Sequence, residues 1–182
     1  MRIVAGQWRG RTLVAPEGQT TRPTSERMRQ AVFDMLAHAP WAEGYLRDTE
    51  VLDVFAGTGA LGLEALSRGA KRAHFMEQDR GALAALKTNL AMCKADKRGV
   101  VLAVDARKPA RGPACSLVFL DPPYARGLIP TALKALDQAG WIGKDALIVA
   151  ETAGDEELEL PARMLAERGH GTGKTTFWRW GE

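Results

Sequence analysis

A short apolar run, a glycine-rich turn and a helical segment follow one another between residues 50 and 68. EVLDVF (50–55) is mostly apolar, which is typical of a strand buried on both faces of a parallel sheet. GALGLEALSR (59–68) has its apolar residues at helical spacing. Because this alternation recurs along the chain, the sequence predicts an α/β fold with helices on both faces of a mostly parallel sheet.

The other predicted elements of this fold repeat the same alternation. Strands are expected over 72–77, 100–105, 116–121, 146–151 and 175–180, and helices over 82–93 and 127–139. The acidic run 151–159 is expected to form a surface loop that faces away from any polyanion.

The start of the chain precedes this alternation. Residues 2–15 are predicted to form a hairpin-like pair of short strands, and Thr24 or Ser25 is expected to cap a following helix. A length of 182 residues fits one domain. We divide this single domain, 1–182, into an N-terminal extension, 1–45, and a Rossmann-like core, 46–182.

The positive charge of the chain is concentrated in the extension. The net charge is +3, whereas residues 1–30 carry six arginines against Glu17 and Glu26, which gives +4 for that segment. Arginine suits bidentate contacts to phosphates, and Trp8 among the arginines can stack on a base. We expect a nucleic-acid-binding surface here, the alternative being a solvated hairpin whose Trp8 packs on its neighbours. The six arginines are Arg2, Arg9, Arg11, Arg22, Arg27 and Arg29.

Acidic residues lie at or near the ends of the first four predicted core strands. They are Asp53, Glu77, Asp105 and Asp121. Ligands of open α/β sheets bind beyond the carboxyl ends of the strands, and those ends share one edge of a parallel sheet. Scattered surface acids do not explain this placement, so we expect a binding site at that edge.

The turn after the first core strand has the G-x-G-x-x-G pattern of a nucleotide-binding loop. Its glycines are Gly57, Gly59 and Gly62, and Glu77 follows Gly57 by 20 residues, where it can bind ribose hydroxyls. This pattern fits both NAD and S-adenosylmethionine. Asp53 favours the second cofactor, because its carboxylate would repel a pyrophosphate and attract an α-ammonium group.

The tetrapeptide Asp121-Pro122-Pro123-Tyr124 follows the fourth core strand. Its prolines fix φ and remove two N–H donors, so the Asp121 carboxylate and the Pro122 carbonyl are left as adjacent acceptors. These acceptors match the two N–H donors of an exocyclic amino group on a base, and Tyr124 provides a face for that base to stack on. We predict amino-group methylation at this position, the alternative being a plain turn.

Composition excludes several other classes of protein. No apolar run approaches the roughly 18 residues of a membrane-spanning helix, and the N-terminus has no stretch of signal-peptide length. The two cysteines, Cys93 and Cys115, cannot form a disulfide framework or a four-cysteine zinc site. We expect a cytoplasmic protein without a metal or a membrane partner.

Several of these motifs together resemble known enzymes. VLDVFAGTGALGLEALSRGA (51–70), Glu77 and DPPY (121–124) are similar to class I S-adenosylmethionine-dependent methyltransferases that act on base amino groups. RIVAGQWRGRTL (2–13) and RPTSERMRQAVFDML (22–36) resemble the RsmD family, the guanine-N2 methyltransferases of 16S ribosomal RNA.

The resemblance implies a three-layer Rossmann-like fold with a mostly parallel seven-stranded sheet, an antiparallel C-terminal strand and an N-terminal β-hairpin and helix. It implies S-adenosylmethionine as cofactor, S-adenosylhomocysteine as product, and a monomer that acts on 16S rRNA in the small subunit or an assembly intermediate.

The resemblance also assigns roles to the motif residues. Asp121, Pro122, Pro123 and Tyr124 would hold the target guanine, and the arginines and Trp8 of the extension would hold the rRNA. The cofactor would be bound by Asp53, Phe55, Gly57 and Gly59, by Glu77 at the ribose, and by Asp105 and Ala106 at the adenine.

Other functions stay open at this stage. The same motif could serve adenine N6 in nucleic acid, or a glutamine amide in a protein. The chain could instead be a ribosome-assembly factor without catalysis, or an NAD-dependent oxidoreductase, although no residue is placed for hydride chemistry.

Overall fold

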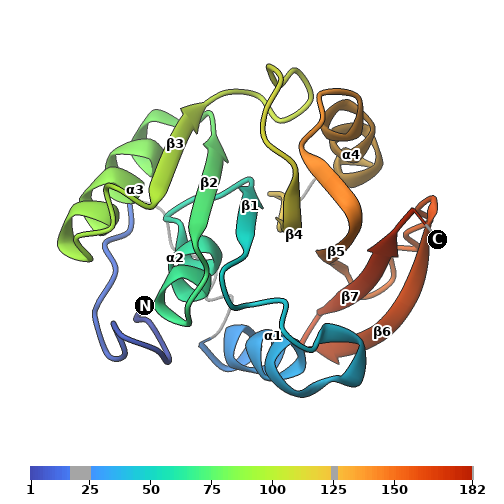
Figure 1. Ribbon diagram of the computed structural model, residues 1–182, viewed down its shortest axis with the longest axis horizontal. Coiled ribbons are helices and arrows are strands. Elements are labelled where there is room, and N and C mark those ends of the chain that lie inside the picture. Colours follow the sequence, from blue (N-terminus) through green and yellow to red (C-terminus); the bar gives the residue numbers. More distant parts are fainter. Residues whose placement is uncertain (17–25, 124–126, 182) are drawn as a thin grey trace.

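The computed structural model describes residues 1–16, 26–123 and 127–181, and its strands form one sheet (Figure 1). The strand order is β3-β2-β1-β4-β5-β7-β6. Strands β1 to β5 pair in parallel, and β7 is antiparallel to both of its neighbours, which confirms the predicted sheet. The strands are β1 (Glu50–Val54), β2 (Arg72–Glu77), β3 (Gly99–Ala103), β4 (Cys115–Leu120), β5 (Ile142–Ala153), β6 (Ala162–His170) and β7 (Gly173–Trp180).

Helices cover both faces of this sheet, giving three layers. They are α1 (Glu26–His38), the short 3-10 helix η1 (Pro40–Ala42), α2 (Ala60–Ser67), α3 (Arg80–Met92) and α4 (Leu128–Gln138). The predicted helices are confirmed, whereas their expected caps Thr24 and Ser25 lie outside the described residues. No helix in the described part of the chain is long and apolar enough to cross a membrane.

Two hydrophobic clusters hold the layers together. Buried residues of α1, α2 and α3 pack on one face of the sheet, where the rings of Phe33 in α1 and Phe119 in β4 lie 5.6 Å apart. Leu133 and Leu136 of α4 belong to the cluster on the other face. Figure 1 shows α4 on the opposite side of the fanned sheet from α1 and α2.

The C-terminal part of the sheet differs from the prediction in two places. Strand β5 continues to Ala153, so the start of the acidic run 151–159 belongs to the sheet rather than to a surface loop. Strand β6 has no counterpart among the strands read from apolar runs. It forms one edge of the sheet with most of its side chains exposed or half-exposed, and such a strand needs no apolar alternation.

The start of the chain turns back on itself without forming the two predicted strands. A single antiparallel bridge joins Arg2 and Thr12. Beside it, the Ile3 N–H donates to the Arg11 carbonyl at 2.9 Å, and the Leu13 N–H donates to the Met1 carbonyl at 2.8 Å. The hairpin prediction was therefore right about the chain reversal and wrong about regular strands.

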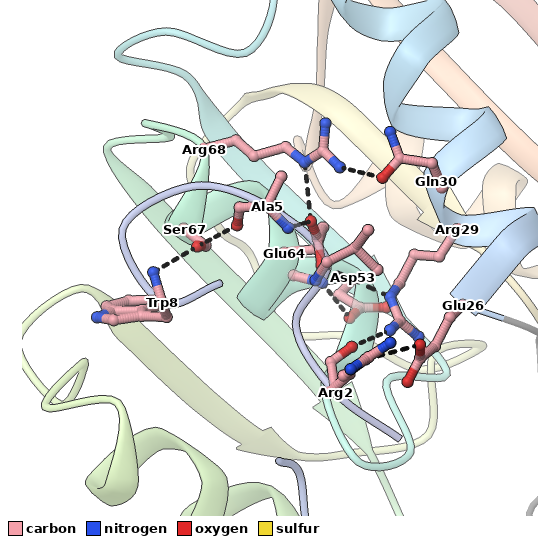
Figure 2. A network of polar contacts seen from close by, with 12 residues as sticks. Arg2, Ala5, Trp8, Glu26, Arg29, Gln30, Asp53, Glu64, Ser67 and Arg68 are labelled. Atoms are coloured by element: carbon pink, nitrogen blue, oxygen red, sulfur yellow. Dashed lines mark hydrogen bonds and ion pairs between the residues drawn. The ribbon is translucent and has the colours of Figure 1, made fainter. Parts of the chain in front are cut away.

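This segment is attached to the last turn of α2 through Ser67 (Figure 2). The Ser67 carbonyl accepts the Gln7 N–H at 2.8 Å, and its hydroxyl donates to the Ala5 carbonyl at 2.6 Å. Gly6 lies so close that an added Cβ would be 2.0 Å from the Ser67 carbonyl oxygen. Gly6, with φ of +83°, thus allows the chain to approach the helix.

A completely buried carboxylate, Glu64 of α2, makes the second attachment (Figure 2). It accepts the backbone N–H groups of Val4 and Ala5 at 2.8 and 2.9 Å, and Nε of Arg68 donates to it at 2.8 Å. Arg29 of α1 also faces it, with Nε 3.7 Å from Oε2. One side chain therefore joins the start of the chain, α1 and α2.

Asn89 of α3, also completely buried, makes the third attachment. Its Oδ1 accepts the Val14 N–H at 2.7 Å, and its Nδ2 donates to the Val14 carbonyl at 3.0 Å. The same Nδ2 donates to the Thr58 carbonyl at 2.9 Å. Asn89 thus connects the extension directly to the glycine-rich loop.

We predict that Gly62→Ala destabilises the fold by about 1–3 kcal/mol, because it overpacks the core. A Cβ on Gly62 would lie 2.3 Å from Cε1 of the buried Phe75 ring. Chemical denaturation measures the change in the free energy of unfolding. Gly169→Ala in β6 is the control, since its Cβ would meet nothing within 4 Å. Equal effects of the two substitutions would contradict the packing argument.

Candidate active site

A cavity of about 350 Å³ opens at the carboxyl ends of β1, β2, β4 and β5. Among the described residues, its wall carries five carboxylates and one guanidinium group. These are Asp53, Glu77, Asp79, Asp121, Glu151 and Arg29. The wall is therefore strongly acidic, as the sequence predicted for this edge of the sheet.

The loop after β1 forms one side of this cavity in an unusual backbone conformation. Phe55 has φ of +61° and Gly57 has φ of +56°, and both residues line the cavity. A bulky residue with positive φ is costly, and such strain is concentrated at functional sites. An added Cβ on Gly57 would meet nothing within 4 Å, so this glycine leaves the backbone open to a ligand.

Glu77 at the end of β2 holds that loop in place. Its Oε2 accepts the Gly57 N–H at 2.8 Å. Its Oε1 accepts the N–H groups of Gln78 and Asp79, each at 2.8 Å. The predicted ribose-binding carboxylate is thus fixed in the wall of the cavity by three backbone donors.

Asp53 is the most deeply buried acid of the wall, with 2% of its surface exposed. Its Oδ2 accepts the Gly62 N–H at 2.9 Å, which orients the carboxylate at the start of α2. Burial raises the pKa of Asp53 well above its ordinary value of 3.8, and the negative charges of Asp121 and Glu77 raise it further. A cation bound in the cavity would stabilise the ionised form of Asp53.

The DPP segment reaches the same cavity from β4. Asp121, Pro122 and Pro123 all line it. Tyr124 lies outside the described residues. The two motifs that sequence analysis singled out, the glycine-rich loop and DPP, therefore meet in one space.

Two of the predicted cofactor residues occupy other positions. Gly59 is not part of the described wall, and an added Cβ there would lie 2.4 Å from Cδ1 of Leu86, so the absence of a Cβ allows the loop to pack on the core. Its contact with the cofactor stays a prediction. Asp105 pairs with Arg107, and Nη2 of Arg107 lies 2.7 Å from Oδ2 of Asp105. The hydrogen bonds from Arg107 lower the pKa of Asp105 to about 2. Its neighbour Ala106 does line the cavity.

Glu151 is a residue of the cavity wall that was not predicted from the sequence. It lies in β5, one residue beyond Ala150, which pairs with Leu120 of β4. Glu151 and Asp121 are therefore neighbours at the ends of adjacent parallel strands. The signal was present, because Glu151 ends an apolar run just as the other four acids do, but it was assigned to the acidic loop.

The arginines of the extension have different environments. Arg2 is exposed and pairs with Glu26 at 3.0 Å, Arg11 donates to the Met92 carbonyl, and Arg9 and Arg27 are exposed. Arg22 lies outside the described residues.

The predicted RNA contacts of Arg29 and Trp8 differ from what the structure shows. Arg29 is completely buried, so the prediction that it contacts RNA is wrong in this conformation. Trp8 is half-buried against the core, and the guanidinium of Arg98 lies 5.0 Å from its ring centroid. Trp8 thus packs on its neighbours, as the alternative interpretation expected.

Within the described ranges 1–16, 26–123 and 127–181, no group of three or more His, Cys, Asp or Glu side chains is arranged so that it could hold a metal ion.

Comparison with known proteins identifies the family. The family model described as conserved hypothetical protein 95 matches residues 1–180. The "Ribosomal RNA small subunit methyltransferase D" of Escherichia coli strain K12 is 38% identical over 182 residues, which cover 97% of this chain and 87% of that protein. The chain belongs to the RsmD family.

Solved structures of similar proteins agree with this assignment to the RsmD family. The structure of yhhF from Escherichia coli superposes with a TM-score of 0.84 at 35% identity, covering 98% of this chain and 97% of that one. HI0767 from Haemophilus influenzae gives a TM-score of 0.79 at 32% identity, with the same coverage of 98% and 97%. This RsmD-family chain therefore shares its whole fold with both relatives.

We predict that Asp53→Asn makes this RsmD-family protein more stable at neutral and alkaline pH. Because the folded pKa of Asp53 is raised, its proton stabilises the fold below pH 3.8, and this stabilisation is lost as pH rises through the raised pKa. Asparagine has no titrating proton, so the gain develops between pH 3.8 and the raised pKa, is complete above that pKa and disappears toward acid.

Chemical denaturation at a series of pH values measures this difference. Asp96→Asn, at an exposed acid, is the control and should leave the free energy of unfolding within about 0.5 kcal/mol. A gain from Asp53→Asn that did not depend on pH would contradict the assignment.

Proposed function

We propose that the chain is an S-adenosylmethionine-dependent methyltransferase that modifies the N2 amino group of a guanine in 16S rRNA. The observation that carries the proposal is that Asp121 and Pro122 line the same cavity as Asp53 and Glu77. Amino-group acceptors and cofactor-binding carboxylates thus share one space. The ribosomal substrate is suggested by the names of relatives in the family.

The charges of the cavity support this cofactor. S-adenosylmethionine has a positively charged sulfonium and an α-ammonium group, and the five carboxylates of the wall favour cations. Asp53 would hold the ammonium, and Glu77 would hold the ribose hydroxyls. A pyrophosphate beside Asp53 would be repelled, which disfavours an NAD-dependent oxidoreductase.

When bound, S-adenosylmethionine supplies an electrophilic methyl group. The task of this chain is to position the nucleophile, because an exocyclic amino group has its lone pair delocalised into the base. The Asp121 carboxylate and the Pro122 carbonyl would accept hydrogen bonds from the two N–H groups of this amino group. This would orient its lone pair toward the methyl carbon. Positioning of this kind can supply roughly 7–11 kcal/mol. The amino group loses one proton, to Asp121 or to water.

The extension would hold the RNA. Met1 lines the cavity, and exposed arginines of the extension lie in the same segment. Phosphates bound by Arg2, Arg9 and Arg27 would place an unstacked base near Asp121. We propose that a monomer acts in this way in the cytoplasm, on the small subunit or an assembly intermediate.

We predict that Asp121→Ala lowers methyl transfer by at least about 100-fold, because it removes an acceptor that positions the amino group. Binding of S-adenosylmethionine should stay within a few-fold, since Asp53 and Glu77 remain. Transfer of labelled methyl groups gives the first quantity and calorimetry the second. Loss of cofactor binding together with activity would contradict the role of Asp121 in positioning the target amino group.

The substrate test uses naked 16S rRNA, small subunits lacking the modification, duplex DNA and a release-factor protein, with products identified by mass. N2-methylguanosine from rRNA or subunits is expected. Detection of N6-methyladenosine or methylglutamine instead would support the assigned catalytic site but contradict guanine N2 of 16S rRNA as the target. RNA binding without turnover, unchanged by Asp121→Ala, would favour an assembly factor.

We predict that Arg9→Gln weakens RNA binding and reduces the slope of log affinity against log salt by roughly 0.7–0.9, the value for one phosphate contact. The control is Lys134→Gln, because Lys134 is exposed on α4, which packs on the other face of the sheet from the start of the chain. Filter binding at several salt concentrations measures both slopes. Equal slopes for the two variants would remove Arg9 from the RNA surface.

A further inference from the structure

Arg29 is an unusual group in the wall of the cavity. It lies in α1, it is completely buried, and it lines the same cavity as Asp53. Its Nη2 donates to the Arg2 carbonyl, whereas Nε and Nη1 make no hydrogen bond with any described residue. A buried guanidinium whose N–H donors lack hydrogen-bond acceptors destabilises the fold, because those donors have lost their hydration.

Glu64 matches the charge of Arg29 only in part. Nε of Arg29 lies 3.7 Å from Oε2 of Glu64, beyond hydrogen-bond distance (Figure 2). Both Glu64 oxygens already accept shorter bonds, from Val4 N–H, Ala5 N–H and Arg68 Nε. Arg29 therefore keeps donor capacity for an anion that enters the cavity.

The chemistry of the proposed cofactor supplies one such anion. Its methionyl group has an ammonium and a carboxylate on the same carbon, so their partners must lie close together. Asp53 is the buried acid of the wall, and Arg29 is the basic side chain of the described wall. On the basis of the function proposed above, we infer that Arg29 binds the methionyl carboxylate while Asp53 binds the ammonium.

The inference explains why this arginine of the extension is buried although others are exposed. Arg27 lies two residues earlier and is exposed, whereas Arg29 points inward. The extension would then contribute to cofactor binding as well as to RNA binding. Arg29 would also favour cationic ligands that carry a carboxylate over cationic ligands that lack one.

The test compares S-adenosylmethionine with its decarboxylated analogue, using the full chain without RNA and calorimetry to measure Kd. The analogue keeps the adenosine, the sulfonium and the amine, and lacks only the carboxylate. We expect the wild-type protein to bind it at least about 10-fold more weakly. In Arg29→Gln, the ratio of the two Kd values should fall to within about 3-fold.

Arg68→Gln is the matched control, because Arg68 also pairs with Glu64 but does not line the described wall. It should preserve the wild-type ratio even if it weakens both affinities. Arg29→Gln/Glu64→Gln removes the buried negative charge together with the positive one, so it keeps the test valid if Arg29→Gln alone does not fold. The ratio in this double variant should also fall to within about 3-fold.

Three results would overturn the inference. Equal affinity of the wild-type protein for both ligands would show that the carboxylate has no cationic partner. An unchanged ratio in Arg29→Gln would assign the carboxylate to another group, such as the α-amino group of Met1. Failure of the wild-type protein to bind either ligand would overturn the proposed function together with this inference.

Discussion

The buried carboxylate of Glu64 is the interaction on which the arrangement of the N-terminal extension depends. It lies in α2, the helix that follows the glycine-rich loop, and it has partners at the start of the chain, in α1 and at the C-cap of α2. A charge in this environment must be matched, because removal of one partner of a buried pair leaves an uncompensated ion. The extension is therefore built into the domain.

The direction of the parallel strands imposes a second constraint. Strands β1 to β5 end at the same edge, so the acids at or near the ends of β1, β2, β4 and β5 are crowded around one cavity. Asp53 has a raised pKa because it is buried and lies near Asp121 and Glu77. The fold thus stores unfavourable electrostatic free energy that a cationic ligand can relieve.

Local patterns were sufficient to predict most of the core. Apolar runs identified β1, β2, β4 and the centre of β5, because these strands are buried on both faces. The glycine-rich loop and DPP were recognised from residues that are adjacent in sequence, and the structure places them in one cavity.

The errors arose where long-range contacts decide the outcome. Arg29 looks like any other arginine of the extension, and its burial depends on Glu64, 35 residues further along the chain. Strand β6 lies at the sheet edge, where exposed side chains carry little pattern.

The attachment made by the hydrogen bonds of Asn89 determines which variants of the extension are informative. One amide holds both backbone groups of Val14 and the carbonyl of Thr58, so the first segment of the chain and the loop beside the cavity share a single support. Met1 and Pro16 also line that cavity. A truncated chain lacking residues 1–16 would lose the support of the loop beside the cavity together with the proposed RNA-binding arginines of this segment. Point substitutions of its exposed side chains would test RNA binding while leaving that support in place.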